Sequence, residues 1–341
     1  MKKLRVLMLM HDYLVPPEDL AGANPATADW RTEYDVLQTL RSELEHDVHP
    51  LGVKDDLAGI RKAHDEFKPH IAFNLLEAFH EVGTFDQNVV SYLELLRLPY
   101  TGCNPRGMLL ARDKALSKKL LQYHRIPVPD FVMVPRGRKP RLAKGLTFPV
   151  IVKSLTQEAS IGISQASVVD GESKLRERVQ FIHESISTDA IVEQYIEGRE
   201  LYCGVLGNQR LQVLPVWEMT FAKMPEGQHR IATERVKWNA KYQEKVGIDT
   251  AAAHDLPAGL AERIQHISKR TYRVLELSGY ARIDLRLDTA GNVRVIEANP
   301  NPQIARGEDL ADSAEKAGIS YPALLQRILT TGMRWEPERL G

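Results

Sequence analysis

The first hundred residues alternate between short apolar runs and segments in which apolar side chains recur at the helical period. This order of strand, helix, strand, helix is the pattern of a parallel sheet joined by crossover helices. The predicted strands cover residues 4–10, 46–51, 70–76 and 99–102, and the predicted helices cover 27–44, 57–67 and 89–98. The sequence therefore predicts an N-terminal α/β domain that ends near residue 103.

The rest of the chain is richer in strands. A pair of helices at 107–110 and 114–123 precedes predicted strands at 129–134, 148–154, 163–169 and 190–196, with a helix at 173–185. A second group comprises strands at 199–207 and 211–219, a helix at 256–277, a hairpin at 280–302 and a closing helix at 321–329. Residues 224–247 are polar and show no apolar face, so we expect a mobile lid, because loops of this length are usually functional or disordered.

The hairpin at 280–302 carries the most informative pattern. Carboxylates that lie opposite one another repel unless a cation lies between them, and hard oxygen ligands suit Mg²⁺. If the hairpin loop has four residues, Asp284 lies opposite Glu297. This pairing predicts such a metal site, with Asn299 as a third oxygen donor. A solvated hairpin face is the alternative. Alternation would put Arg282, Asp284 and Arg286 on one face of the first strand, and Val295, Glu297 and Asn299 on one face of the second.

Other candidate residues are weaker when taken singly. Lys153 ends an apolar strand, where it either meets an anion such as phosphate or extends its ammonium group to solvent. Lys114 is one of several lysines on a predicted amphipathic helix, where a solvated side chain is the alternative to a ligand contact. Glu193 and Glu200 either contact a polar ligand from two sides or are exposed at the surface end of a strand. Lys241 and Tyr242 fall in the presumed lid, where disorder is the alternative.

Composition excludes several classes of partner. The 45 basic and 45 acidic side chains balance, and neither sign forms a long run, so nothing favours nucleic acid or an anionic membrane. No apolar run approaches the roughly 20 residues that span a bilayer. The N-terminus does not read as a secretory signal, and Cys103 and Cys203 cannot form a disulfide framework, which fits a reducing cytoplasm. Small-molecule partners are favoured.

Familiar nucleotide and metal motifs are absent from the sequence: there is no Walker glycine loop, no G-x-G-x-x-G after the first strand, no H-E-x-x-H and no C-x-x-C. Instead, an ordered series of fragments resembles the ATP-grasp superfamily, and within it the D-alanine–D-alanine ligase branch, over nearly the whole chain. The order and spacing carry the resemblance. The fragments are PYTG at 99–102, Asp113-Lys114, IPVP, PVIVK ending at Lys153, a small-residue loop to Gly162, VEQYIEGRE, NAKY, RID and EAN.

The resemblance implies an α/β ATP-grasp fold: a Rossmann-like N-terminal domain over 1–103, a central ATP-binding subdomain over 104–193, and a catalytic subdomain over 194–341 with the lid near 224–247. It also implies roles for individual residues. Lys114 and Lys153 would contact the phosphates of ATP, with Ser160 in the phosphate loop. Glu193, Gln194, Tyr195 and Ile196 would hold adenine, and Glu200 would bind the ribose.

The resemblance further implies that Asp284, Glu297 and Asn299 carry two Mg²⁺ ions, with Mn²⁺ as the alternative metal. Arg282 would stabilise the transferring phosphoryl group and the later oxyanion, and Lys241 would close over the γ-phosphate beside Tyr242. The resemblance is compatible with a homodimer.

The residues that bind the amino-acid substrates in the family pattern are different in this chain. The early glycine-and-serine loop, whose glutamate reads the first substrate's amine, is replaced by residues 11–25. The serine of the phosphate loop is Ala159, and the glycine after the metal ligands is Gln303. The Ser-His-Ser-Leu that grips the second carboxylate is replaced by residues 306–310, which include Glu308 and Asp309.

These patterns predict an ATP-dependent carboxylate–amine ligase that works through an acyl phosphate and uses altered amino-acid substrates. Acids at the second subsite would favour a basic or amidated acceptor, unless Glu308 and Asp309 only cap a helix. A true D-alanine–D-alanine ligase, an ATP-grasp kinase and a non-catalytic nucleotide-binding protein are the alternatives.

Overall fold

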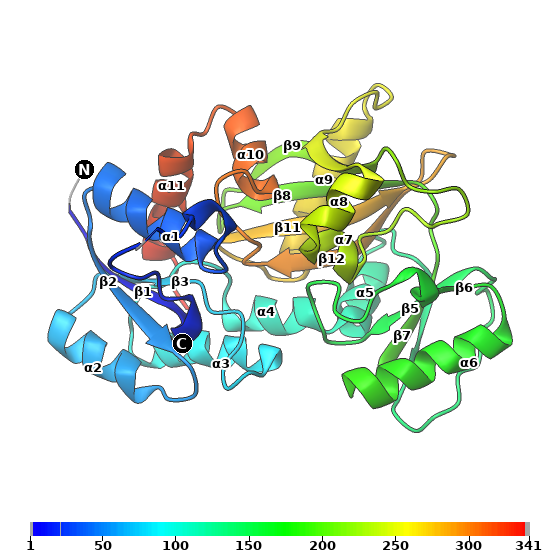
Figure 1. Ribbon diagram of the computed structural model, residues 1–341, viewed down its shortest axis with the longest axis horizontal. Helices are drawn as coiled ribbons and strands as arrows, with labels where there is room; N and C mark the ends of the chain where they lie inside the picture. Colours follow the sequence, from blue (N-terminus) through cyan, green and yellow to red (C-terminus); the bar gives the residue numbers. More distant parts are fainter. Residues whose placement is uncertain (1–2, 21, 338–341) are drawn as a thin grey trace.

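Three separate sheets form the frame of the protein, and the computed structural model describes residues 3–20 and 22–337 of the chain. In Figure 1 the first sheet lies at the left, the second forms a lobe at the lower right, and the third lies in the upper middle. Among the described residues, no helix has the length and apolar character needed to cross a membrane.

The first sheet is parallel, as the sequence predicts. Its order is β2-β1-β3, from β1 (Arg5–His11), β2 (Asp47–Val53) and β3 (Ile71–Asn74). The accompanying helices are α1 (Arg31–Gln38), α2 (Ala58–Phe67) and α3 (Asp86–Leu95). The strand predicted at 99–102 is only a single bridge between Ala72 and Tyr100. The closing helix α11 (Tyr321–Met333) packs on β3, a docking that local periodicity does not reveal.

The second sheet is antiparallel and has the order β4-β7-β5-β6. Its strands are β4 (Phe131–Val134), β5 (Val150–Ser154), β6 (Val168–Val169) and β7 (Ala190–Gln194), and α6 (Glu172–Phe181) covers one face. The strand predicted at 163–169 is wrong in extent, because only its last two residues pair in the sheet. Reciprocal hydrogen bonds between Ser164 and Ser167 hold the preceding residues in a tight 3₁₀ turn.

The third sheet is also antiparallel and has the order β10-β9-β8-β11-β12. Its strands are β8 (Arg199–Leu206), β9 (Gln212–Phe221), β10 (Ile248–Ala252), β11 (Tyr280–Leu287) and β12 (Val293–Pro300). The sequence does not predict β10, because its residues are small or polar and lie at the sheet edge. Helix α9 (Leu260–Val274) begins later than predicted, after Gly259 in a left-handed conformation. Helix α10 (Asp309–Lys316) follows the last strand.

The hairpin of β11 and β12 places Asp284 opposite Glu297, as predicted, but the pairing register near the turn differs from the predicted one. Near the turn Leu287 pairs with Val293, one residue away from the predicted register. A β-bulge between Asp284 and Leu285 then restores the register. The predicted common face of Val295 and Glu297 is therefore wrong, since Val295 packs in the core while Ile296 and Glu297 both line a cavity.

The first and third sheets share one apolar core. Side chains of β1, such as Leu7 and Leu9, belong to the same buried cluster as Ile283 and Leu285 of β11. Helices α4 (Pro105–Arg112) and α5 (Lys114–Tyr123) form the predicted pair, with α4 against β12 and α5 against α9 and β4. The second sheet has its own core with α6. The domain boundaries at 103 and 193 remain an interpretation of the sequence.

Candidate active site

A cavity lies where the second and third sheets face each other, beneath residues of the 224–247 segment. Most of the predicted nucleotide residues line it, together with Asp284 and Glu297. Its walls are Ile151, Lys153, Ser160, Ile163, Glu193, Gln194, Tyr195, Ile196, Glu200, Ile231, Ala232, Lys237, Asp284, Leu285, Arg286, Ile296 and Glu297. An apolar end and a charged end can be distinguished among these side chains.

The apolar end is a slot between the second sheet and the 224–247 segment. Ile151, Tyr195 and Ile231 form a small buried cluster there, with Ile163 packed against it. At the edge of the slot, Glu200 accepts a hydrogen bond of 2.8 Å from Arg286 Nη2 and one of 3.0 Å from the hydroxyl of Tyr202. A flat apolar slot with carboxylates at its edge suits a purine nucleoside.

Glu193 lies buried at the inner end of this slot between two lysines. Its Oε2 atom is 3.1 Å from Nζ of Lys153, and its Oε1 atom is 3.2 Å from Nζ of Lys118. Lys118 also donates a hydrogen bond to the carbonyl of Ile296. Burial alone would raise the pKa of Glu193, but the two ammonium groups lower it. Removing one partner of such a buried set costs about 3–5 kcal/mol, because it leaves an uncompensated charge.

Lys118 is a residue that the sequence reasoning missed. It exposes only 1% of its surface and lies one helical turn after Lys114. The available signal is its position on the face of α5 that also carries Ala115 and Leu121, both buried. A lysine on the apolar face of a helix needs an anionic partner, and Glu193 is that partner.

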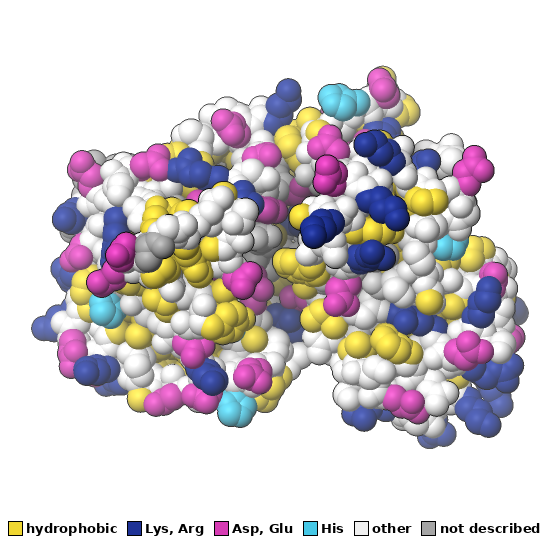
Figure 2. Space-filling view, viewed as in Figure 1, with side chains coloured by type: hydrophobic (Ala, Val, Ile, Leu, Met, Phe, Trp, Pro, Cys, Tyr) yellow, Lys and Arg dark blue, Asp and Glu magenta, His cyan; other side chains and the backbone are white. Residues whose placement is uncertain are grey.

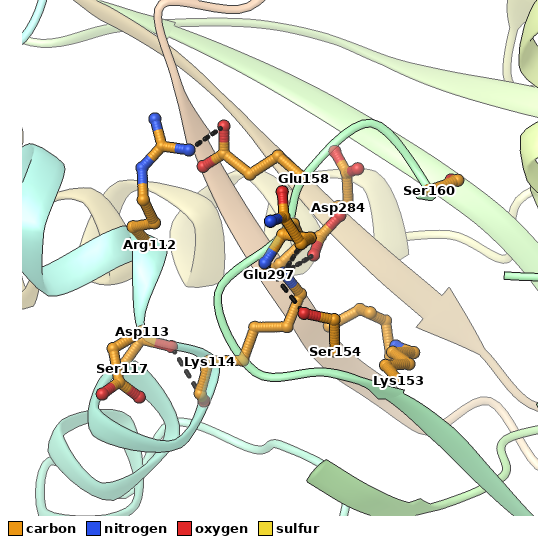
Figure 3. Close-up of polar contacts among 12 residues, drawn as sticks. Arg112, Asp113, Lys114, Ser117, Lys153, Ser154, Glu158, Ser160, Asp284 and Glu297 are labelled. Carbon is orange, nitrogen blue, oxygen red and sulfur yellow. Dashed lines mark hydrogen bonds and ion pairs between the residues drawn. The ribbon is translucent and has the colours of Figure 1, made fainter. Parts of the chain in front are cut away.

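The charged end gathers acids and lysines around β11 and β12, as the close-up shows (Figure 3). Nζ of Lys114 is 3.6 Å from Oε2 of Glu297 and donates a 2.7 Å hydrogen bond to the carbonyl of Gln157. Burial would raise the pKa of Glu297, yet the surrounding lysines lower it to about 2. Burial raises the pKa of Asp284, and the facing charge of Glu297 adds to this.

Arg282 is held over the same end of the cavity. Its Nε and Nη2 atoms donate hydrogen bonds of 2.8 and 3.0 Å to the two oxygens of Asp284. Its Nη1 atom is 3.6 Å from Oδ2 of Asp309, and its guanidinium lies 4.6 Å from the ring centroid of Tyr202. A planar guanidinium fixed in this way holds its positive charge in a defined position beside Asp284, which lines the cavity.

The oxygen donors at this end fit a magnesium ion that also binds phosphate. Asp284 and Glu297 lie opposite each other, and each carboxylate keeps lone pairs beyond those used by Arg282 and Lys114. Asn299 lies two residues after Glu297 and pairs with Arg282, but it is not among the residues that line the cavity. The described part of the chain contains no cluster of three or more His, Cys, Asp or Glu side chains arranged for a metal. Mg²⁺ commonly takes one or two carboxylates and completes its shell with water and phosphate.

Comparison with known proteins identifies the family of this chain. The model of the D-ala D-ala ligase C-terminus matches residues 120–330, which is more than half of the chain. The chain belongs to the D-alanine–D-alanine ligase family.

Relatives and solved structures agree with this family. The D-alanine–D-alanine ligase A of Bacillus cereus is 30% identical over 292 residues, covering 85% of this chain and 88% of that protein. The uncharacterized protein y4sG of Sinorhizobium fredii is 34% identical over 264 residues, covering 77% and 75%. The crystal structure of the Bacillus anthracis D-alanine–D-alanine ligase with ATP superposes with a TM-score of 0.74 at 25% identity, covering 97% and 98%. The protein is therefore an ATP-dependent ligase that forms C–N bonds, with the ATP-grasp fold.

Two predicted lid residues of the ligase lie outside the cavity. Lys241 is exposed, and Tyr242 stacks with the guanidinium of Arg235 at 4.3 Å. Lys237, on the preceding helix of the same segment, lines the cavity and lowers the pKa of Glu297 together with the other lysines. The roles predicted for Lys241 and Tyr242 stay predictions. The sequence reasoning missed Lys237 because only Lys241 lies in the family fragment NAKY.

The 224–247 segment forms two short helices, α7 (Glu234–Trp238) and α8 (Ala240–Val246). The expectation that it lacks an apolar face is wrong, since Val236 is buried against Tyr202 and Trp217. Its other contacts are both apolar and polar: Ile231 packs with Ile151 and Tyr195, and the carbonyls of Ala232 and Ala159 accept hydrogen bonds from Ser160 and Trp238. The segment covers the cavity, and its opening as a lid stays a prediction.

We expect nucleotide binding to protect this lid from trypsin. An ATP analogue with Mg²⁺ should slow cleavage after Lys237 and Lys241, because the phosphates would hold the lid closed. Mass spectrometry of timed digests gives the rates, and cleavage after Lys174, exposed on α6, serves as the internal control. Equal rates after Lys237 and Lys241 with and without nucleotide would count against a lid.

The loop that departs from the family pattern is tied into the fold of the ligase. Arg306 contacts Glu43 and Thr39 and lies over the ring of Tyr321, so its charge is used within the structure. Glu308 precedes the first residue of α10 and lies 3.5 Å from Arg31. Asp309 begins that helix, where an acid is favoured by the helix dipole, and it also faces Arg282.

Proposed function

We propose that the ligase activates a carboxylate as an acyl phosphate and joins it to an amine, releasing ADP and phosphate. The observation that carries this proposal is the meeting of Asp284 and Glu297 across the hairpin, beside Lys114 and Arg282. A carboxylate is a poor electrophile and must be phosphorylated before an amine can attack it. Such a reaction needs positioned positive charge rather than a side-chain nucleophile.

The proposed nucleotide site follows the two ends of the cavity. Adenine would lie in the apolar slot against Ile151 and Ile231, with Glu193 at its edge, and Glu200 would bind the ribose. The phosphates would then extend toward the charged end. Lys114 and Lys237 lie there to neutralise them, and Lys153 lies between the two ends through its contact with Glu193.

In this proposal Asp284, Glu297 and Asn299 hold Mg²⁺, which would neutralise charge on the phosphate oxygens of ATP. Charge stabilisation at the acyl group and exclusion of water fall to other residues of the chain. Arg282 stabilises negative charge on the acyl group, and the lid, whose Ala232 carbonyl is held by Ser160, excludes water that would hydrolyse an acyl phosphate.

We also propose that the amino-acid substrates differ from two molecules of D-alanine. Asp309 lies 3.6 Å from Arg282, so a carboxylate of the second substrate would meet an acid as well as the arginine. Like charges in a closed site repel, which disfavours an acceptor with a free carboxylate at this position.

Phosphate release with mass analysis of products tests the reaction type. The protein is incubated with ATP, Mg²⁺ and pairs of amino acids or dipeptides. We expect phosphate release that depends on a substrate pair, with a product whose mass equals the two substrates less one water. A product that gains only a phosphoryl group would indicate a kinase, and ATP turnover that no substrate stimulates would contradict the ligase proposal.

We expect D-alanine alone to be a poor substrate, and Asp309→Ser to improve its use. Removing the carboxylate beside Arg282 should lower the KM for D-alanine by about tenfold, the effect of roughly 1.4 kcal/mol. Asp312→Ser, in the same first turn of α10, removes an equal charge and is the matched control. Efficient D-alanyl-D-alanine synthesis by the unchanged protein would refute the idea of altered substrates.

A further inference from the structure

Arg286 is a buried cation in the wall of the nucleotide cavity, and the proposed reaction does not use its charge. It exposes 6% of its surface and lies opposite Glu200 in the pairing of β11 with β8. A buried guanidinium is costly unless its charge is paired and its donors are used. The partners of Arg286 therefore indicate what it does.

The guanidinium of Arg286 joins the predicted ribose acid to the segment that covers the cavity. Its Nη2 atom donates hydrogen bonds of 2.8 Å to Oε2 of Glu200 and of 2.7 Å to the backbone carbonyl of Arg230. Its Nη1 atom donates one of 3.1 Å to the carbonyl of Gly198, just before β8. Glu200 lies on β8, whereas Arg230 belongs to the 224–247 segment. One rigid planar group thus contacts both the acid and the predicted lid.

Glu200 is held by donors on both of its oxygen atoms and still has capacity for a ligand. The hydroxyl of Tyr202 donates to Oε1 at 3.0 Å, and Arg286 donates to Oε2. A carboxylate can accept about four hydrogen bonds, so lone pairs remain for a ligand in the cavity that Glu200 lines. The two fixed donors also set the direction of these lone pairs, which favours recognition of hydroxyl groups at defined positions.

Backbone carbonyls hold the first part of the 224–247 segment in place. Three side chains from other parts of the chain donate to them: Gln165 to His229 at 2.9 Å, Arg286 to Arg230 at 2.7 Å, and Ser160 to Ala232 at 2.7 Å. Figure 2 shows Lys and Arg side chains over α7 and α8, the two helices that follow. Of the three donors, Arg286 also binds Glu200, so a ligand at Glu200 can act on the segment through one side chain.

We propose that Arg286 is a positioning residue that couples recognition of the ribose at Glu200 to docking of the predicted lid at Arg230. A hydroxyl that donates to Glu200 fixes the carboxylate, and the carboxylate keeps the guanidinium where it reaches the carbonyl of Arg230. Without that hydroxyl the lid loses part of its support even when nucleotide is bound. The inference rests on the proposed nucleotide site, and it makes the ribose a condition for lid docking as well as a source of affinity.

Trypsin cleavage after Arg230 tests this coupling, because Arg230 is exposed and the bond that trypsin cuts contains the carbonyl held by Arg286. The complete protein is digested with ATP, 2′-deoxy-ATP or 3′-deoxy-ATP, each with Mg²⁺ and without amino acids. Calorimetry gives each Kd, and every nucleotide is then used at a saturating concentration. Cleavage after Lys174, exposed on α6, is the internal control.

We expect at least one of the two deoxynucleotides to bind about tenfold more weakly than ATP, as loss of a charge-assisted hydrogen bond requires. At saturation, the same deoxynucleotide should leave cleavage after Arg230 at least about fivefold faster than ATP does, a coupling of the size usual between two sites.

Two variants separate the coupling from affinity, and ATP binding by each shows that it is folded. Tyr202→Phe removes the other hydrogen bond to Glu200 and keeps the ring that packs against Val236. It should weaken ATP binding and preserve the difference in cleavage. Arg286→Lys keeps the charge beside Glu200, but an ammonium group cannot reach all the acceptors that the guanidinium contacts. With this variant, ATP and the deoxynucleotide should give equal cleavage at saturation.

Equal cleavage at saturation with all three nucleotides in the unchanged protein would overturn the coupling, and this comparison holds even if a variant does not fold. A difference in cleavage that survives in folded Arg286→Lys would overturn it as well. In both cases, substrate-dependent phosphate release from ATP would leave the ligase function intact. Failure of all three nucleotides to bind would instead remove the proposed nucleotide site together with the coupling.

Discussion

Replacing Glu297 by glutamine is expected to lower turnover by about a thousandfold, the effect of losing several kcal/mol of charge stabilisation at the phosphoryl group. Glutamine keeps the shape of the side chain and removes the charge that faces Asp284 and Lys114. The surrounding lysines outweigh burial and lower the pKa of Glu297 to about 2. The carboxylate is therefore ionised above that pH, and its favourable interactions are lost only as the pH falls toward about 2.

The loss of turnover in Glu297→Gln should consequently be the same at every pH between about 5 and 9, because a group of such low pKa does not titrate there. Phosphate release with a cognate substrate pair gives kcat across this range. Glu262→Gln removes an exposed acid from α9 and controls for charge alone. Turnover near that of the unchanged protein, in a folded Glu297→Gln variant, would remove Glu297 from the proposed metal site.

Arg282→Lys is expected to lower kcat by about 10²–10³-fold, the usual effect of removing one donor to a developing oxyanion. Lysine keeps the positive charge but cannot make both hydrogen bonds to Asp284, so its charge is no longer held in a fixed position. The KM for ATP should change little, because Arg282 does not line the nucleotide cavity.

The matched control for Arg282→Lys is Arg294→Lys, on the neighbouring strand β12 away from the reacting groups. Steady-state kinetics with ATP and the amino-acid substrates varied in turn separate kcat from KM. A change in the KM for ATP with kcat unchanged would show that Arg282 serves nucleotide binding rather than charge stabilisation.

Period-two alternation predicts the central hairpin, whereas the meeting of Asp284 with Glu297 was predicted from a four-residue loop and arises instead from a bulge. The parallel first sheet and the helix pair around Lys114 also follow from local periodicity, because these elements bury one face against a single neighbour. The ordered family fragments supplied most of the residues that line the nucleotide cavity.

What the sequence did not predict depends on contacts between distant segments. In the sequence Lys118 is one of several lysines on a helix. Only the fold shows that Glu193, from the second sheet, lies beside it. In the sequence Lys237 is part of a polar segment. Only the fold shows that it lies on α7 and lines the cavity. Glu33 reads as an acid favoured by a helix N-terminus, and only the packing of α1 shows that one of its oxygens lacks a partner among the described residues.

The bulge in the β11–β12 hairpin places an apolar and an acidic side chain next to each other on the cavity face of one strand. In a regular strand Val295 and Glu297 would point the same way, but here Ile296 and Glu297 both face the cavity while Val295 and Ala298 face the core. Ile296 is therefore the additional residue: its side chain walls the apolar slot, and its carbonyl accepts the hydrogen bond of Lys118. A strand without Ile296 would still present its acid to the cavity, because Glu297 would then follow Val295 directly and lie on the opposite face from it.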